Sequence, residues 1–170
     1  MVIGAPRSGT AWASVFLTTE HSVCLHDPLW DHYYKDLDKI PCAGKQLGIA
    51  CTGFGFYPEW LNHHPARKVV LHRELSELVA SAKRLGMPPP EATLLAKLHQ
   101  IQGLHVDWTD LFENPLPLYE YLLRAPFVDR ERHRQLVALK ITSRWEVRRD
   151  QANAQTIERY ARDGLIIKMR

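Results

Sequence analysis

Short apolar runs alternate with longer amphipathic stretches along this chain. The clearest run is Lys-Val-Val-Leu at 68–71, which is β-branched in its centre and typical of a buried strand. The stretch at 76–85 carries apolar residues at helical spacing and is followed by Gly86, a common helix stop. A strand followed directly by a helix is the repeating unit of a parallel α/β sheet.

The same pattern recurs from end to end. We expect strands at 2–3, 22–25, 47–51, 68–71, 104–108, 136–141 and 165–169, and helices at 10–19, 59–63, 76–85, 91–102, 116–123 and 146–162. These elements predict a three-layer α/β fold with a mostly parallel central sheet and helices on both faces. A chain of 170 residues suits a single domain, 1–170.

Composition narrows the class of ligand. The net charge of +3 suits an anionic small molecule and is too small to indicate a nucleic-acid partner. Three cysteines without a Cys-x-x-Cys pair indicate reduced thiols in a cytoplasmic protein. No apolar run reaches the length of a membrane span, and the N-terminal stretch does not resemble a signal peptide, so we expect no membrane partner. The composition leaves the oligomeric state open.

The stretch VIGAPRSGTAW at 2–12 has the build of a phosphate-binding loop. A short apolar strand leads into a turn in which Gly4 and Gly9 have the Walker A spacing. Thr10 and Ala11 stand where a nucleotide triphosphatase carries Lys and Ser/Thr, which argues against a magnesium-bound triphosphate. Arg7 instead supplies a fixed positive charge within the turn.

The segment Pro6-Arg7-Ser8-Gly9-Thr10-Ala11-Trp12 resembles the 5′-phosphosulfate loop of sulfotransferases that use 3′-phosphoadenosine 5′-phosphosulfate (PAPS). The resemblance implies the sulfotransferase form of the P-loop fold, with PAPS as donor and 3′-phosphoadenosine 5′-phosphate (PAP) as product. It implies that the loop from Pro6 to Ala11 binds the 5′-phosphate and sulfuryl group. The residues expected to contact these groups are Arg7, Ser8, Gly9 and Thr10. It also implies that Trp12 stacks on the adenine.

A second segment matches the 3′-phosphate motif of the same family. That motif is a buried strand, an Arg at its end and a Ser eight positions later, and here Arg73 and Ser81 have that separation. A third and weaker resemblance covers the stretch from Trp108 to Asn114-Pro115. The Gly/Lys-rich segment with which cytosolic members close over the 3′-phosphate has no counterpart in this sequence.

The general base has three candidates. Cytosolic members place a catalytic His after the third strand, where this chain has Thr52-Gly53. Some bacterial sulfotransferases, including those acting on carbohydrates, have an acidic base after the first helix, and Asp27 fits that position. The neighbouring His26 and His32 are alternatives, because a histidine titrates near neutral pH.

The sequence therefore predicts an enzyme that transfers a sulfuryl group to a hydroxyl or amine of a small-molecule or carbohydrate acceptor. Two alternatives stay open: a nucleotide or small-molecule kinase with a degenerate Walker A loop, and a non-catalytic nucleotide-binding protein of the same fold. We expect no metal site, because adjacent histidines such as His63 and His64 point in different directions and have no carboxylate at matching spacing.

Overall fold

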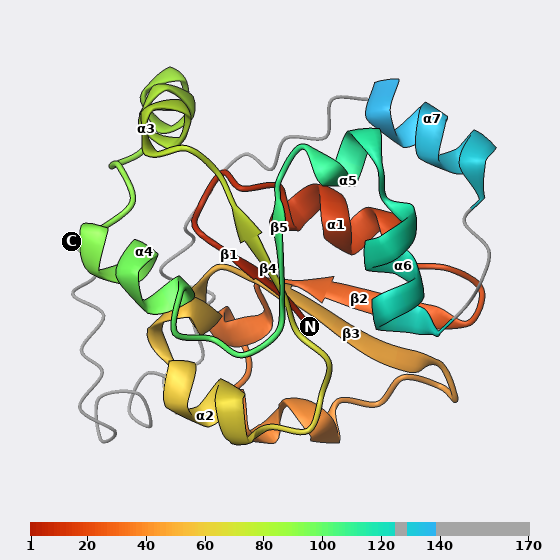
Figure 1. Ribbon diagram of the computed structural model, residues 1–170. Coiled ribbons are helices and arrows are strands. Elements are labelled where there is room, and N and C mark those ends of the chain that lie inside the picture. The colour runs from red at the N-terminus through yellow and green to blue at the C-terminus, as the bar shows by residue number, and fades with distance from the viewer. Residues whose placement is uncertain (125–128, 139–170) are drawn as a thin grey trace.

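The computed structural model describes residues 1–124 and 129–138 of the chain. Within these residues five strands form one sheet, in which every pairing is parallel and the order is β2-β3-β1-β4-β5 (Figure 1). The strands are β1 (Val2–Gly4), β2 (Ser22–His26), β3 (Gln46–Cys51), β4 (Val69–His72) and β5 (Leu104–Asp107). The expectation of an α/β fold with a parallel central sheet is confirmed.

The first strand lies in the middle of the sheet. Val2 of β1 is in register with Ala50 of β3 on one side and with Val69 of β4 on the other. Because ligands of open parallel sheets bind outside the carboxyl ends of the strands, the loop after β1 begins at the centre of the edge where a ligand is expected. We call this carboxyl-end edge the rim.

Side chains alternate between two cores along the central strands. Val2 and Leu71 belong to one core, and Ile3 and Val70 belong to the other. The first core packs beneath α1 (Thr10–Phe16), α5 (Asp110–Glu113), α6 (Leu116–Leu123) and α7 (Arg130–Ala138). The second packs beneath the 3₁₀ turns η2 (Tyr34–Lys39) and η3 (Gly53–Phe56), with α2 (Pro58–His63), α3 (Leu75–Arg84) and α4 (Ala92–Leu98). The sheet is therefore covered on both faces (Figure 1).

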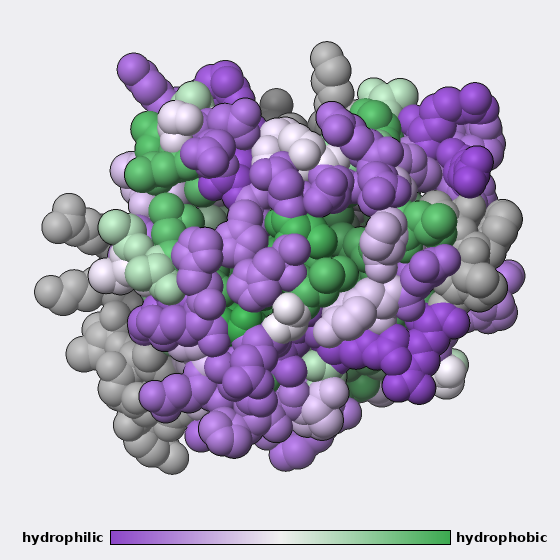
Figure 2. All heavy atoms as spheres, viewed as in Figure 1, coloured by the Kyte–Doolittle hydropathy of each residue, from purple (hydrophilic) through white to green (hydrophobic). Residues whose placement is uncertain are grey.

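Hydrophilic side chains cover most of the face shown in Figure 2, and apolar ones show through near its centre. No helix in residues 1–124 and 129–138 is long and apolar enough to cross a membrane.

One predicted strand is wrong. Residues 136–138, expected to begin a strand at 136–141, are the last residues of helix α7. Leu136 is buried against the first core, and Arg132 donates to carbonyls of Val15, Phe16 and Thr18 at the end of α1, so both contacts hold a helix here. The helix expected at 146–162 and the strand expected at 165–169 lie outside the described residues.

Candidate functional site

The loop between β1 and α1 turns sharply and is held closed by one serine. Arg7 and Gly9 both have left-handed backbone angles, with φ of 76° and 94°. Ser8 is fully buried, and both its N–H and its hydroxyl donate to the Ala5 carbonyl, at 3.1 and 2.7 Å. A Cβ on Gly4 would overlap the Ser8 hydroxyl, so only glycine fits there. Ser8 therefore shapes the loop and uses up its own donors in doing so.

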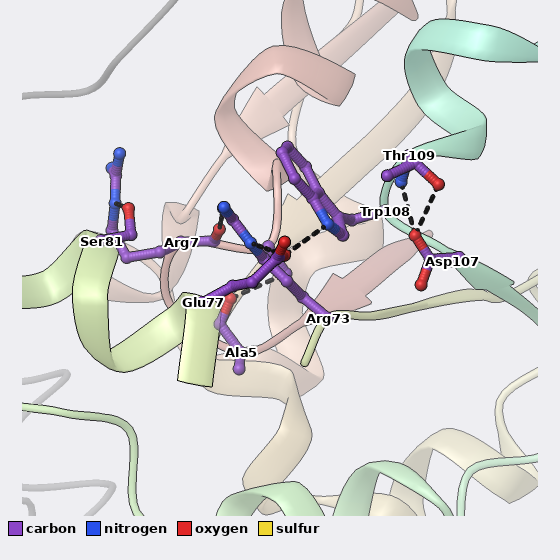
Figure 3. Close-up of polar contacts among 9 residues, drawn as sticks. Ala5, Arg7, Arg73, Glu77, Ser81, Asp107, Trp108 and Thr109 are labelled. Atoms are coloured by element: carbon purple, nitrogen blue, oxygen red, sulfur yellow. Dashed lines mark hydrogen bonds and ion pairs between the residues drawn. The ribbon is translucent and has the colours of Figure 1, made fainter. Parts of the chain in front are cut away.

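Arg73 directly follows β4, and its side chain contacts the loop between β1 and α1. One of its Nη1–H groups donates to the Arg7 carbonyl at 2.7 Å, and its Nε donates to a Glu77 oxygen at 3.0 Å. The guanidinium carbon lies 3.7 Å from the centre of the Trp108 ring, in cation–π contact. Figure 3 shows Arg73 between the loop, the first turn of α3 and Trp108, the residue after β5. Residues that follow the carboxyl ends of β1, β4 and β5 thus meet at Arg73.

Arg7 and Ser81, which come from the two separate motifs, are in direct contact. The Arg7 Nε donates to the Ser81 hydroxyl oxygen at 3.2 Å, across 74 positions of sequence (Figure 3). Burial lowers the pKa of Arg7, and the nearby charges of Arg73 and Arg84 lower it further. Among the described residues, the ion pair between Arg73 and Glu77 is the only one that involves these three arginines. Arg7, Arg73 and Arg84 therefore place positive charge close together, which suits an anion.

A second polar cluster lies beside the loop, at the ends of β2 and β3. One Asp27 oxygen accepts hydrogen bonds from the backbone N–H and the hydroxyl of Thr52, at 2.7 and 3.2 Å. The other oxygen lies 3.3 Å from the His26 Nε2. The same nitrogen is 3.4 Å from the hydroxyl of Thr10, the first residue of α1. His26 thus stands between Thr10, at the start of α1, and the Asp27 carboxylate.

The backbone at Asp27 explains this arrangement. Its φ of 45° is left-handed, and its N–H still pairs with the Ala50 carbonyl as β2 ends. The turn η1 (Pro28–Trp30) follows at once, and His32 lies beyond it with an exposed side chain. Of the three predicted base candidates, Asp27 and His26 are brought together and His32 lies further along the chain.

Trp12 lies in the core and not on the rim. Its ring stacks on Phe16 with 5.0 Å between ring centres and meets Phe112 edge-on at the same distance. Its indole N–H donates to the Leu136 carbonyl in α7 at 3.2 Å, and only 3% of the residue is exposed. An adenine would have to displace α7 to stack on this ring, so this placement does not fit the role that the resemblance implies. The neighbouring loop residues Pro6 and Ala11 are half-buried.

Three histidines cluster against the end of β4. The His72 Nε2 and the His105 Nδ1 are 2.7 Å apart, and the His72 ring also stacks on His99 with 4.7 Å between centres. Burial lowers the pKa of His72, and the two other histidines lower it further. The described residues contain no group of His, Cys, Asp or Glu arranged to hold a metal ion.

A cavity of about 360 Å³ lies at the opposite edge of the sheet, near the amino ends of β1, β2 and β3. Its walls are mostly apolar side chains, with Arg67 and Arg124 among the polar ones. It contains none of the predicted site residues.

Sequence reasoning missed the importance of Glu77 and Thr52. The Arg73-x-x-x-Glu77 spacing at the start of a predicted helix was a usable signal for Glu77, because residues four apart on a helix are neighbours. Thr52 had no such signal, since its contact with Asp27 depends on two strands that pair across the sheet.

The fold is that of a parallel α/β protein, and the loop of its first strand–loop–helix unit meets Arg73 at the rim. The chain matches no known protein-family model and no curated protein.

Proposed function

We propose that this protein is a PAPS-dependent sulfotransferase that acts on a hydroxyl or amine of a small-molecule or carbohydrate acceptor. The contact between Arg7 and Ser81 carries the proposal, because it joins the two segments that the resemblance assigns to the two ends of one nucleotide. Arg73, which belongs to the second segment, also contacts the first, because it donates a hydrogen bond to the Arg7 carbonyl.

The donor set suits a ligand with two phosphate groups. Arg7 and the Thr10 hydroxyl face the 5′-phosphosulfate end, and Arg73, Ser81 and the charge of Arg84 serve the 3′-phosphate end. Guanidinium groups bind phosphate oxygens well because their N–H groups are planar and always charged. Adenine binding by Trp12 is not part of the proposal, because that ring is covered.

PAPS supplies an activated sulfuryl group with a phosphate leaving group. In the transfer, a bond forms between the acceptor oxygen or nitrogen and sulfur while the bond from sulfur to the 5′-phosphate oxygen breaks. The protein has to position the acceptor, neutralise charge on the departing oxygen and take the acceptor proton. Arg7 neutralises the charge. We assign the proton to the Nδ1 of His26, because its Nε2 already faces the Asp27 carboxylate at 3.3 Å and the Thr10 hydroxyl at 3.4 Å.

Asp27 then acts as the residue that positions His26. One of its oxygens is engaged by two hydrogen bonds from Thr52, and the other faces the imidazole. A carboxylate in this place orients a histidine ring and stabilises its protonated form.

The test is PAP formation from PAPS with a panel of phenols, sugars and amines, in the presence of EDTA. We expect turnover by the wild-type protein and a fall in kcat of about 100-fold or more in His26→Asn, which removes a general base. The matched control is His32→Asn, which we expect to stay within about twofold because its side chain is exposed beyond η1. A loss of rate in His32→Asn with none in His26→Asn would overturn the base assignment.

The same panel of acceptors with ATP in place of PAPS, with and without magnesium, and a titration with PAP separate the two alternatives. A kinase would turn over ATP only with magnesium, whereas sulfuryl transfer proceeds in EDTA. A non-catalytic nucleotide-binding protein would bind PAP and give no product with any acceptor. Either result would refute the sulfotransferase proposal.

A further inference from the structure

One carboxylate oxygen of Glu77, at the rim, accepts hydrogen bonds from two different side chains. The Glu77 Oε2 accepts from the Arg73 Nε at 3.0 Å and from the Trp108 indole Nε1 at 3.1 Å (Figure 3). Two N–H donors that converge on a single oxygen, one of them on a guanidinium, make the kind of position that a phosphate oxygen also occupies.

The donor side of this position is fixed without Glu77. Arg73 is held by its hydrogen bond to the Arg7 carbonyl and by its contact with the Trp108 ring, and its side chain is only 12% exposed. Trp108 in turn packs edge-on against Phe112, with 5.3 Å between ring centres. The two donors therefore keep their place when the oxygen between them changes.

The acceptor side is open to solvent. The Glu77 side chain is 48% exposed and stands in the first turn of α3, a helix of ten residues. A surface ion pair four residues apart on a helix contributes little net stability, so a ligand can displace this carboxylate at small cost. A phosphate that replaces it remains near the same helix amino end, which favours negative charge.

The Glu77 carboxylate also blocks part of Arg73. It occupies the Nε–H of the guanidinium, while the Arg7 carbonyl uses one hydrogen of Nη1. A bidentate grip on a phosphate through the edge that contains Nε is possible only after Glu77 has left.

We propose that Glu77 is an internal stand-in for a phosphate oxygen: a phosphate group of the ligand displaces it, and the Trp108 indole N–H then becomes a phosphate ligand beside Arg73. The identity of that group as the 3′-phosphate of PAP rests on the proposed function. The displacement itself requires only a phosphate group, so the two can fail separately.

The first experiment is calorimetric titration of wild type and Glu77→Gln with inorganic phosphate and with PAP. The glutamine keeps the shape and removes the competing charge, so we expect both ligands to bind about tenfold more tightly, a change of ~1.4 kcal/mol. The matched control is Glu74→Gln, which removes the same charge from the exposed residue before α3. We expect its affinities to stay within about twofold of wild type, because only the Glu77 carboxylate occupies the donors.

The second readout follows Trp108 directly. We expect its indole ¹H–¹⁵N signal, assigned with Trp108→Phe, to shift when phosphate is added to the wild-type protein, and Trp108→Phe to lose affinity for phosphate. Equal or weaker phosphate binding by Glu77→Gln, or equal gains in both glutamine variants, would overturn the displacement. So would the absence of phosphate binding to wild type and Glu77→Gln alike. Tighter phosphate binding by Glu77→Gln with no preference for PAP over phosphate would support displacement and count against the proposed nucleotide.

Discussion

Replacing Arg73 by lysine keeps the charge at the rim and removes the shape that the structure uses. A lysine ammonium lacks the planar guanidinium that donates to the Arg7 carbonyl and the Glu77 carboxylate while its carbon lies 3.7 Å from the centre of the Trp108 ring. A hydrogen bond from a charged group is worth about 1.5–3 kcal/mol, the ring contact about 0.5–1 kcal/mol, and the half-exposed ion pair little. Allowing for the contacts that lysine retains, we expect Arg73→Lys to lower the free energy of unfolding by about 2 kcal/mol.

The assay is urea unfolding followed by tryptophan fluorescence, together with calorimetric titration with PAP. For a chain of this size, 2 kcal/mol corresponds to a fall in Tm of roughly 4–8 °C. Since the loop that Arg73 supports is the proposed anion site, we expect PAP affinity to fall about 30-fold, which is also ~2 kcal/mol. A lysine variant with wild-type stability and wild-type PAP affinity would show that charge alone matters, and would refute the role assigned to the guanidinium.

Three further variants test single features. Gly9→Ala should lower the free energy of unfolding in urea by about 1–3 kcal/mol, because the residue has a φ of 94° and its new Cβ would lie 2.8 Å from Leu111 Cδ1. An unchanged urea midpoint would contradict this loop geometry. Trp12→Phe should lower the free energy of unfolding by about 1–2 kcal/mol, because the hydrogen bond to the Leu136 carbonyl is lost. It should leave the affinity for PAP within about twofold of wild type. A large loss of PAP affinity would instead indicate that adenine stacks on Trp12. Burial lowers the pKa of His72, so below its ordinary value of 6.5 the folded state binds fewer protons than the unfolded state. The stability that neutral His72 contributes should therefore be complete above pH 6.5 and fall as the pH drops below it. His72→Gln should reduce the difference in free energy of unfolding between pH 7.5 and pH 5, and the same difference in both proteins would contradict this role of His72.

The sequence indicated the sheet well because its central strands are buried on both faces. Val69, Val70 and Leu71 form a continuous, largely β-branched apolar run of the kind that buried parallel strands contain, and the loop glycines mark where β1 ends. The run at 136–141 was misleading because a short apolar segment fits a strand or a buried helix equally well. The preceding residues of α7 are mostly good helix formers, and helical spacing lets both His133 and Leu136 reach the first core.

The candidate site was predicted in part. Arg73 and Ser81 lie near the loop, as expected for residues at and after the end of a neighbouring parallel strand. The burial of Trp12 was not predictable from its motif, because it depends on α7, which begins more than a hundred positions later. The pairing of His26 with Asp27 also depends on tertiary structure, since Thr52 of the adjacent strand end holds the carboxylate in place.

The most direct test of the central claim is calorimetric titration of the wild-type protein with PAP, AMP and ATP, with and without magnesium. If Arg7, Arg73 and Ser81 form one site for two phosphates, PAP binds without magnesium and about 100-fold more tightly than AMP, the equivalent of two charged hydrogen bonds to the 3′-phosphate. Equal affinity for PAP and AMP, or binding of ATP alone and only with magnesium, would contradict the account.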